Sequence, residues 1–183
     1  MKKYDELLCI RFEQEKDENF SKFSATIMKS DKIVGVRVPT LKKIAKEFTK
    51  YDDFLENVTL SSFESVAVAG YYISKTTTGL VALEKRIKQF LPFIYNWGNC
   101  DMFVSSLKIL KKDTNNEFLP FIYECLDSEN LFTVRFAIVV LMSYYMKDCN
   151  LTQKILEDVT TKQGREYYID MAIAWLVSVA FVK

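Results

Sequence analysis

Apolar and polar positions alternate with helical spacing along almost the whole chain after residue 39. Apolar side chains recur every three or four residues, which places them on one face of a helix. The pattern predicts helices separated by short segments rich in Asn, Asp, Ser and Gly. The expected ranges are 41–48, 63–74, 80–95, 101–112, 117–126, 131–146, 151–160 and 166–182. The first 30 residues carry mixed charge and several Phe residues, and they predict one or two further helices.

Local signals mark the start of two of these helices. Pro39 suits the first turn of the helix at 41–48, because its fixed φ angle is already helical. Ser61 followed three residues later by Glu64 is a capping-box pattern, and it stands directly before the helix at 63–74.

The segment FLPFIY occurs twice, at 90–95 and at 118–123. The first copy continues as NWGNCD and the second as ECL, so we interpret the repeat as architecture and the altered ending as chemistry. A literal repeat among helices spaced by about 30 to 40 residues indicates stacked helical pairs of the HEAT-like kind. The alternative is an irregular bundle in which the segment recurs by coincidence. We predict an all-α fold, an α-α superhelix (HEAT-like helical repeat solenoid), forming a single domain over residues 1–183.

Composition removes several chemistries. The chain has no histidine, which excludes Ser-His and Cys-His nucleophilic pairs and histidine zinc sites. Its four cysteines lie far apart with no CxxC motif, so we expect no metal, no cofactor, and free buried thiols in a reducing cytoplasm. No apolar run approaches the roughly 20 residues of a membrane span. The net charge is +1, so any nucleic-acid role must depend on a local basic face.

One predicted helix, 101–112, combines an acid with lysines. At about 100° per residue, Asp101, Ser105, Lys108 and Lys112 share one face. Asp at the start of a helix is also a common N-cap, which leaves a structural interpretation of Asp101 open.

Other unusual residues lie on or beside the helices. Arg135 is the one charge on its helix before the far end, and it needs either an acidic partner or a bound phosphate. Trp175 aligns with Tyr168 and Met171 on one helix face, and Trp97 stands four residues before Asp101. Each tryptophan is either a core side chain or a ligand contact.

Four stretches resemble the AlkD-like bacterial DNA alkylation repair glycosylases, which are HEAT-like repeat proteins. They are VGVRVPTLKKIAKEF (34–48), NWGNCDMFVSSLK (96–108), FTVRFAIVVLMSYY (132–145) and YYIDMAIAWLVSVAFVK (167–183). The resemblance implies a monomer that binds duplex DNA in a positively charged concave cleft and excises cationic bases such as 3-methyladenine and 7-methylguanine. Members of that family usually continue with another helical segment, so the end of the sequence at Lys183 leads us to expect a domain that lacks this segment.

The resemblance assigns roles to four residues of this chain. Trp97 and Trp175 are expected to pack against the backbone and sugar of the damaged nucleotide, Arg135 to contact phosphate, and Asp101 to perform the chemistry. Further phosphate contacts are expected from five lysines: Lys108, Lys112, Lys42, Lys43 and Lys46. Gly98 stands where family members often have Asp. The alternative function is a HEAT-like scaffold that binds DNA or protein without excision.

Overall fold

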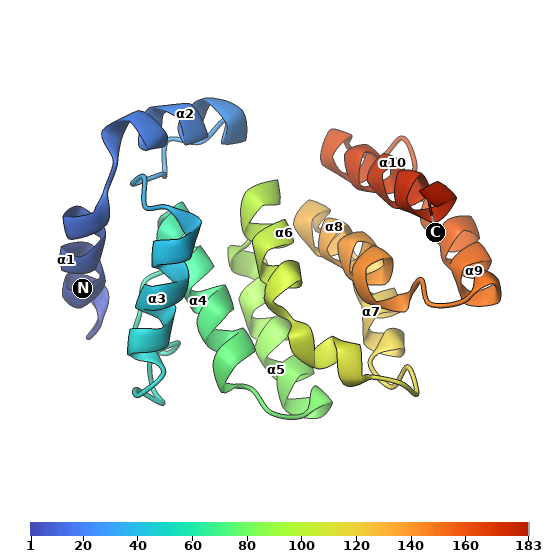
Figure 1. Cartoon of the computed structure of the whole chain (residues 1–183), viewed down its shortest axis with the longest axis horizontal. Helices are drawn as coiled ribbons and strands as arrows, with labels where there is room; N and C mark the ends of the chain where they lie inside the picture. Colours follow the sequence, from blue (N-terminus) through green and yellow to red (C-terminus); the bar gives the residue numbers. More distant parts are fainter. Residues whose placement is uncertain (183) are drawn as a thin grey trace. The chain divides into compact units, whose positions relative to one another are not determined.

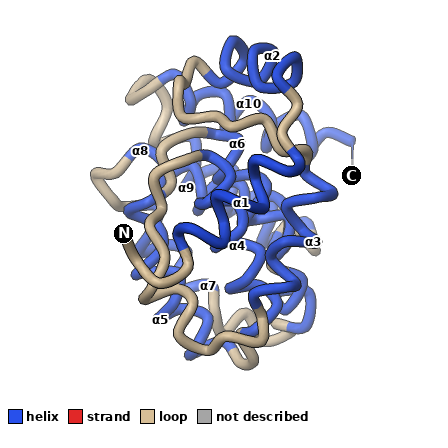
Figure 2. The backbone as a smooth tube through the Cα atoms, turned by 90° about the vertical axis from the view of Figure 1, so that its left-hand side faces the viewer, coloured by secondary structure: helices blue, strands red, loops and turns tan. Residues whose placement is uncertain are grey.

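Helices account for the regular structure of residues 1–182, the part of the chain that the computed structural model describes (Figures 1 and 2). The α-helices are α1 (Asp5–Glu15), α2 (Glu18–Met28), α3 (Val38–Phe48), α4 (Phe63–Thr76), α5 (Leu80–Phe90), α6 (Trp97–Ser106), α7 (Leu119–Leu126), α8 (Leu131–Val140), α9 (Cys149–Thr160) and α10 (Tyr167–Val182). Two 3-10 helices, η1 (Leu91–Phe93) and η2 (Lys108–Lys112), and a π-helix (Leu141–Tyr145) extend α5, α6 and α8.

Every helix predicted after residue 39 is present, and the first 30 residues form α1 and α2. Helices pack in pairs, α3 with α4 and α7 with α8, as expected for helical repeats. The prediction of an all-α helical-repeat fold is therefore confirmed. The chain falls into two compact units, Met1–Thr77 and Thr78–Lys183. A single domain over residues 1–183 stays a prediction.

The two copies of FLPFIY form different structures. The first copy, residues 90–95, ends α5 and forms η1, where Pro92 cannot continue the α-helix hydrogen bonding. The second copy, residues 118–123, begins α7 with Pro120 in the first turn, where the missing N–H is not needed. The interpretation of FLPFIY as an architectural repeat is therefore wrong, since the same six residues end one helix and start another.

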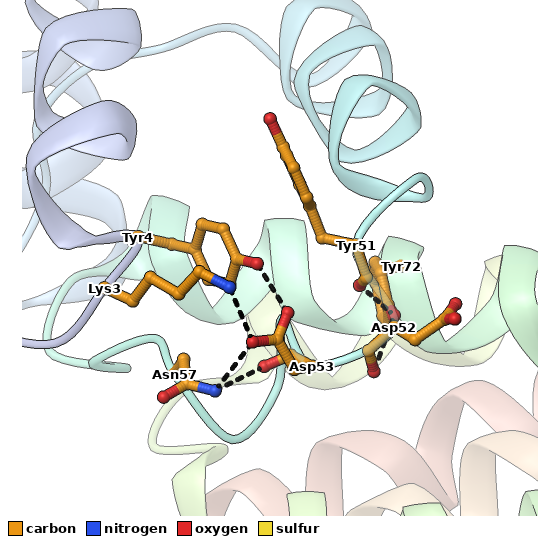
Figure 3. Close-up of polar contacts among 7 residues, drawn as sticks. All are labelled: Lys3, Tyr4, Tyr51, Asp52, Asp53, Asn57 and Tyr72. Atoms are coloured by element: carbon orange, nitrogen blue, oxygen red, sulfur yellow. Dashed lines mark hydrogen bonds and ion pairs between the residues drawn. The ribbon is translucent and has the colours of Figure 1, made fainter.

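In unit Met1–Thr77, aromatic rings form the core around the end of α3. Tyr4, Phe48, Phe54 and Tyr72 are each at most 4% exposed, and neighbouring rings lie 4.7–6.1 Å apart. Polar contacts are made by two of these core residues, Tyr4 and Tyr72 (Figure 3). Asp53 accepts hydrogen bonds from Tyr4 and from Lys3, the latter at 2.8 Å, so the N-terminal segment is tied to the loop after α3.

Helix α4 begins at Phe63 as predicted, but its capping box lies one residue later than predicted. Ser62 is the N-cap, and it exchanges hydrogen bonds with Ser65 at 3.1 and 3.0 Å. The predicted pair of Ser61 and Glu64 is therefore wrong. The side chain of Glu64 is fully buried and turns toward a different partner, the loop before α3.

In unit Thr78–Lys183, α8 is the central helix and packs against α6, α7 and α10. Its residues from Val134 to Val140 are all buried, which explains why the helix is apolar almost all round. The π-helix that follows α8 keeps Tyr144 and Tyr145 buried, and their hydroxyls donate to the Val104 carbonyl (2.8 Å) and the Asp113 carboxylate (2.6 Å).

The cysteines are free thiols, and their exposure divides them into two pairs. Cys100 and Cys125 are buried, as expected, whereas Cys9 and Cys149 are exposed, so the expectation of buried thiols is wrong for these two. Among residues 1–182, no helix has the length and apolar character needed to cross a membrane.

Candidate active site

Helix α6 starts at Trp97, and its N-cap is Asn96. Asn96 has an extended backbone, and its Oδ1 accepts the Asn99 N–H at 2.9 Å while its Nδ2 donates to Asn99 Oδ1 at 2.9 Å. The NWGNCD segment thus begins a helix, and Asp101 lies in its second turn rather than at its start. The N-cap interpretation of Asp101 is therefore wrong, because Asn96 already performs that role.

Asp101 is held by Arg135 from the neighbouring helix α8. Arg135 Nε donates to Asp101 Oδ1 at 3.0 Å, and Arg135 Nη2 donates to Asp101 Oδ2 at 2.8 Å. The remaining nitrogen, Nη1, donates to the main-chain carbonyl of Tyr168 at 2.7 Å, in the first turn of α10. One guanidinium therefore links α6, α8 and α10, with the two-pronged geometry in which Arg binds a carboxylate most strongly.

The two partners differ in their access to solvent. The Arg135 side chain is 3% exposed, whereas the Asp101 side chain is 19% exposed. A guanidinium this deeply buried needs all its hydrogen bonds satisfied, and the acid-partner interpretation of Arg135 is the one seen in the structure. The Asp101 side chain, by contrast, remains partly accessible to solvent, and each carboxylate oxygen can accept a further hydrogen bond.

Cys100 lies beside the ion pair on the buried side of α6. Its Sγ is 3.9 Å from the carbonyl oxygen of Phe132, the residue that follows the first residue of α8. Burial raises the pKa of the Cys100 thiol well above its usual value, and the Asp101 charge raises it further. The thiol therefore stays protonated, and it contributes packing rather than nucleophilic chemistry.

Aromatic side chains occur on the helices that carry the pair. Trp97 is half-buried one helical turn before Asp101, and Trp175 is 44% exposed on α10. The core interpretation of Trp175 is therefore wrong. The Tyr168 ring, whose main chain binds Arg135, lies 5.9 Å from the Phe132 ring. Partly exposed aromatic side chains therefore lie on α6, the helix that carries Asp101, and on α10, which Arg135 links to α6.

The lysines do not continue the face of Asp101. The α-helix ends at Ser106, and Lys108 and Lys112 belong to η2 beyond the break at Leu107, so the predicted shared helical face is wrong. Both lysines are exposed and remain available to a polyanion. Arg135 does not join them in an exposed basic strip, because it is buried and neutralised by Asp101.

Three features of this site were not predicted from the sequence: the pairing of Arg135 with Asp101, the contact with the Tyr168 carbonyl, and the cap at Asn96. The lone charge of Arg135 on an apolar helix signals that a partner exists, but it does not identify Asp101, 34 residues away. The Tyr168 carbonyl gives no side-chain signal at all. Asn96 could have been found, since Asn followed three residues later by a side chain able to bond back is a recognisable helix start.

The fold and the site define an all-α helical-repeat protein with an accessible carboxylate fixed by a buried arginine. The model of the family described as DNA alkylation repair enzyme matches residues 10–179, and the chain belongs to this family. Comparison with curated proteins gives no match, and neither does comparison with solved structures.

Proposed function

We propose that this protein is a DNA glycosylase that excises cationic alkylated purines, 3-methyladenine and 7-methylguanine, by hydrolysing the N-glycosidic bond. Membership of the DNA alkylation repair enzyme family supports a role on alkylated DNA. The observation that carries the finer proposal is the Asp101 carboxylate, which Arg135 holds by two hydrogen bonds while the side chain stays partly exposed to solvent. A fixed, ionised group of this kind suits a reaction in which positive charge develops.

The chemistry needs few groups. Alkylation at N3 or N7 makes the base cationic and hence a good leaving group, so no general acid is required. What remains is to stabilise an oxocarbenium-like sugar and to direct a water molecule, tasks that carboxylates perform in glycoside hydrolysis. We assign both tasks to Asp101. Arg135 acts through Asp101 in this proposal, because its three nitrogens are already occupied and its side chain is buried.

The DNA contacts are part of the same proposal. Trp175, which is exposed, and Trp97, which is half-buried, are proposed to contact the sugar and backbone of the damaged nucleotide. Lys108 and Lys112 are exposed and suit backbone phosphates, as do Lys42, Lys43 and Lys46 on α3. We propose that the protein works as a monomer in the cytoplasm, without metal or cofactor.

The alternative is a DNA-binding or protein-binding scaffold without excision activity. It is favoured by the same ion pair, because both Asp101 oxygens already accept hydrogen bonds from Arg135 and the pair is neutral as a whole. In the scaffold, Asp101 has the single task of compensating a buried guanidinium.

Substituting Asp101 alone does not separate these functions. The Asp101→Asn variant leaves the Arg135 guanidinium buried without a counter-charge, which destabilises a protein by roughly 3–5 kcal/mol. A second substitution, Arg135→Met, removes that charge and fills much of the same volume, so no unpaired charge is left buried. We therefore expect the double variant to regain most of the parent's melting temperature.

The decisive measurement is release of 7-methylguanine from duplex DNA by the parent and the double variant, below both melting temperatures. If Asp101 stabilises the transition state, release falls by about 10²-fold or more although the fold is restored. Asp127→Asn serves as a matched control, since Asp127 pairs with Lys162 in the same unit. Unchanged release by the double variant would exclude Asp101 from the chemistry, and no release by the parent would favour the scaffold.

A further inference from the structure

The loop before α3 is fixed by a fully buried carboxylate. Glu64 on α4 is 0% exposed, and its two oxygens accept the N–H groups of three consecutive loop residues. The distances are 2.9 Å from Val34, 2.7 Å from Gly35 and 3.3 Å from Val36. Hydrogen bonds to a charged, buried acceptor are among the stronger ones in proteins, so the backbone of this loop is held in one conformation.

The same loop is joined to the start of α2 by close backbone contact. Gly35 has φ +106°, and a Cβ atom there would lie 2.6 Å from the Asp17 carbonyl oxygen and 2.8 Å from Ser21 Cβ. The Gly35 carbonyl accepts the Asp17 N–H at 3.1 Å. Glycine is required for both the angle and the approach, and the contact brings Asp17 and Phe20 next to the end of the loop.

Arg37 follows directly after the loop residues that Glu64 binds. It precedes the first residue of α3, and its side chain is 62% exposed. The guanidinium carbon lies 4.7 Å from the centre of the Phe20 ring, and Nη2 donates to Asp17 Oδ2 at 2.8 Å. Stacking on an aromatic ring orients the guanidinium without using its hydrogen-bond donors.

Arg37 differs in this respect from two other arginines of the chain. Arg135 and Arg11 each use Nε, Nη1 and Nη2 in hydrogen bonds. Among the described residues 1–182, Arg37 has one hydrogen-bond partner, Asp17, and its side chain is largely exposed, so its other N–H groups remain available to a ligand. The bond to Asp17 is an exposed ion pair, of a kind that contributes little to stability, so an incoming anion can readily replace it.

We propose that Arg37 is a phosphate-binding residue for duplex DNA, oriented by the Phe20 ring and by the loop that Glu64 fixes. This inference rests on the proposed function only in taking duplex DNA as the substrate. The guanidinium fork matches phosphate oxygens in pairs, which suits a backbone contact that sets the register of the duplex. Glu64 is a positioning residue in this proposal, since it acts through the loop and touches no DNA.

The test is the salt dependence of binding to a fluorescently labelled, undamaged duplex. The binding constant K falls as salt rises, so the slope of log K against log salt is negative. Each lost phosphate contact makes this slope less steep by about one unit. We expect this change in Arg37→Ala. Arg11→Ala is the matched control, because Arg11 belongs to the same unit, carries the same charge and is bonded to Glu47. Its slope should equal that of the parent.

A second variant tests the same idea in the opposite direction. Asp17→Asn removes the charge that competes for Arg37, while Asn still accepts the Phe20 N–H as the N-cap of α2. We expect this variant to bind duplex DNA several-fold more tightly than the parent at low salt. Because it adds no cavity and keeps the cap, it remains informative even where Arg37→Ala folds poorly.

The outcomes separate this inference from the proposed excision. An unchanged slope in Arg37→Ala and unchanged affinity in Asp17→Asn would overturn the inference and leave the glycosylase proposal standing. The expected changes, together with no release of 7-methylguanine by the parent, would support Arg37 as a DNA contact and overturn excision. Absence of duplex binding by the parent would overturn both.

Discussion

At the scale of single residues, the pairing of Asp101 with Arg135 changes what a substitution can reveal. A buried guanidinium is stable only with its donors satisfied, and Arg135 meets this need with one carboxylate and one carbonyl. From the sequence, Arg135 needed either an acidic partner or a phosphate, and the family resemblance implied the phosphate. Because the side chain is 3% exposed, such a contact would require breaking the pair. The Asp101 carboxylate thus serves both the stability of the fold and the proposed chemistry. Only a double variant that also removes the Arg135 charge separates these two roles.

The cysteines provide a direct check on burial around the site. Cys9 and Cys149 are exposed, whereas Cys100 and Cys125 are buried. Burial raises the pKa of Cys125 to about 12, with Glu124 adding to the effect, and it raises the pKa of Cys100 well above its usual value. Since the thiolate is the reactive form, a thiol reagent at pH 8 should modify Cys9 and Cys149 quickly and the other two slowly.

Counting modified thiols in native and urea-unfolded protein measures this difference, with peptide mass analysis to identify them. Rapid modification of Cys100 in the native protein would contradict the packing described for α6 and α8.

At the scale of elements, the existence of helices was more predictable than their ends. Apolar spacing located every helix after residue 39, because burying one face of a helix imposes a period that short polar loops interrupt. Ends depend on single hydrogen bonds instead. Helix α6 begins at Trp97, after the cap Asn96, rather than at residue 101, and the cap of α4 is Ser62 rather than Ser61, although α4 begins at Phe63 as predicted. FLPFIY shows the limit most clearly, since its role as helix end or helix start depends on the residues around it.

The same limit applied to the site. The sequence supplied Asp101, Arg135 and both tryptophans as candidates, because each is unusual for its position in a helix. It did not supply the pairing of Asp101 with Arg135, which arises from packing between α6 and α8 over a separation of 34 residues. It also assigned Glu64 to a local cap, whereas the structure uses this residue to hold a loop about 30 residues away.

Asp113 stabilises the turn between η2 and α7, and this leads to a prediction about acid. Its carboxylate accepts the N–H groups of Glu117 (2.8 Å) and Phe118 (3.1 Å) and the hydroxyl of Tyr145 (2.6 Å). Burial alone raises the pKa of Asp113, but the bonds from Tyr145 and the two backbone N–H groups outweigh it, so the net pKa lies below its usual value. Replacing the carboxylate by an amide should destabilise the fold by roughly 2–3 kcal/mol at pH 7.

The sign of the pH dependence follows from linkage. A carboxyl whose pKa is lower in the folded state contributes its stability in full above the unfolded pKa of about 3.9, and loses it as pH falls through the folded pKa. The stability difference between the parent and Asp113→Asn should therefore be constant near pH 7 and shrink below about pH 4. Urea unfolding at several pH values measures it, with Asp148→Asn as a control, because Asp148 is an exposed N-cap that Asn can replace. A difference that does not change with pH would contradict this account.

At the scale of the whole molecule, the charge balance determines how DNA can be held. The net charge of the chain is +1, so a general attraction to a polyanion is absent and binding must come from particular cations. Many of these cations are engaged with acids, as Arg135 is with Asp101 and Lys88 with Glu84 and Glu124. The exposed lysines of η2 have no acidic partner among the ion pairs of the described residues, and η2 directly follows α6, the helix that carries Asp101, which makes them candidates for DNA contacts in unit Thr78–Lys183.

We therefore predict that replacing both Lys108 and Lys112 by Ala lowers the salt slope of duplex binding by about two units, one for each phosphate contact. The control replaces Lys85 and Lys154, which are also exposed in the same unit, so that net charge changes equally. If binding depended on net charge alone, the two double variants would weaken DNA binding equally. If η2 contacts the DNA backbone, only the variant of Lys108 and Lys112 changes the salt slope. Fluorescence anisotropy with an undamaged duplex at several salt concentrations decides between them. Equal slopes in the two double variants would remove Lys108 and Lys112 from the DNA contact, while leaving the assignment of Asp101 to be judged by base release.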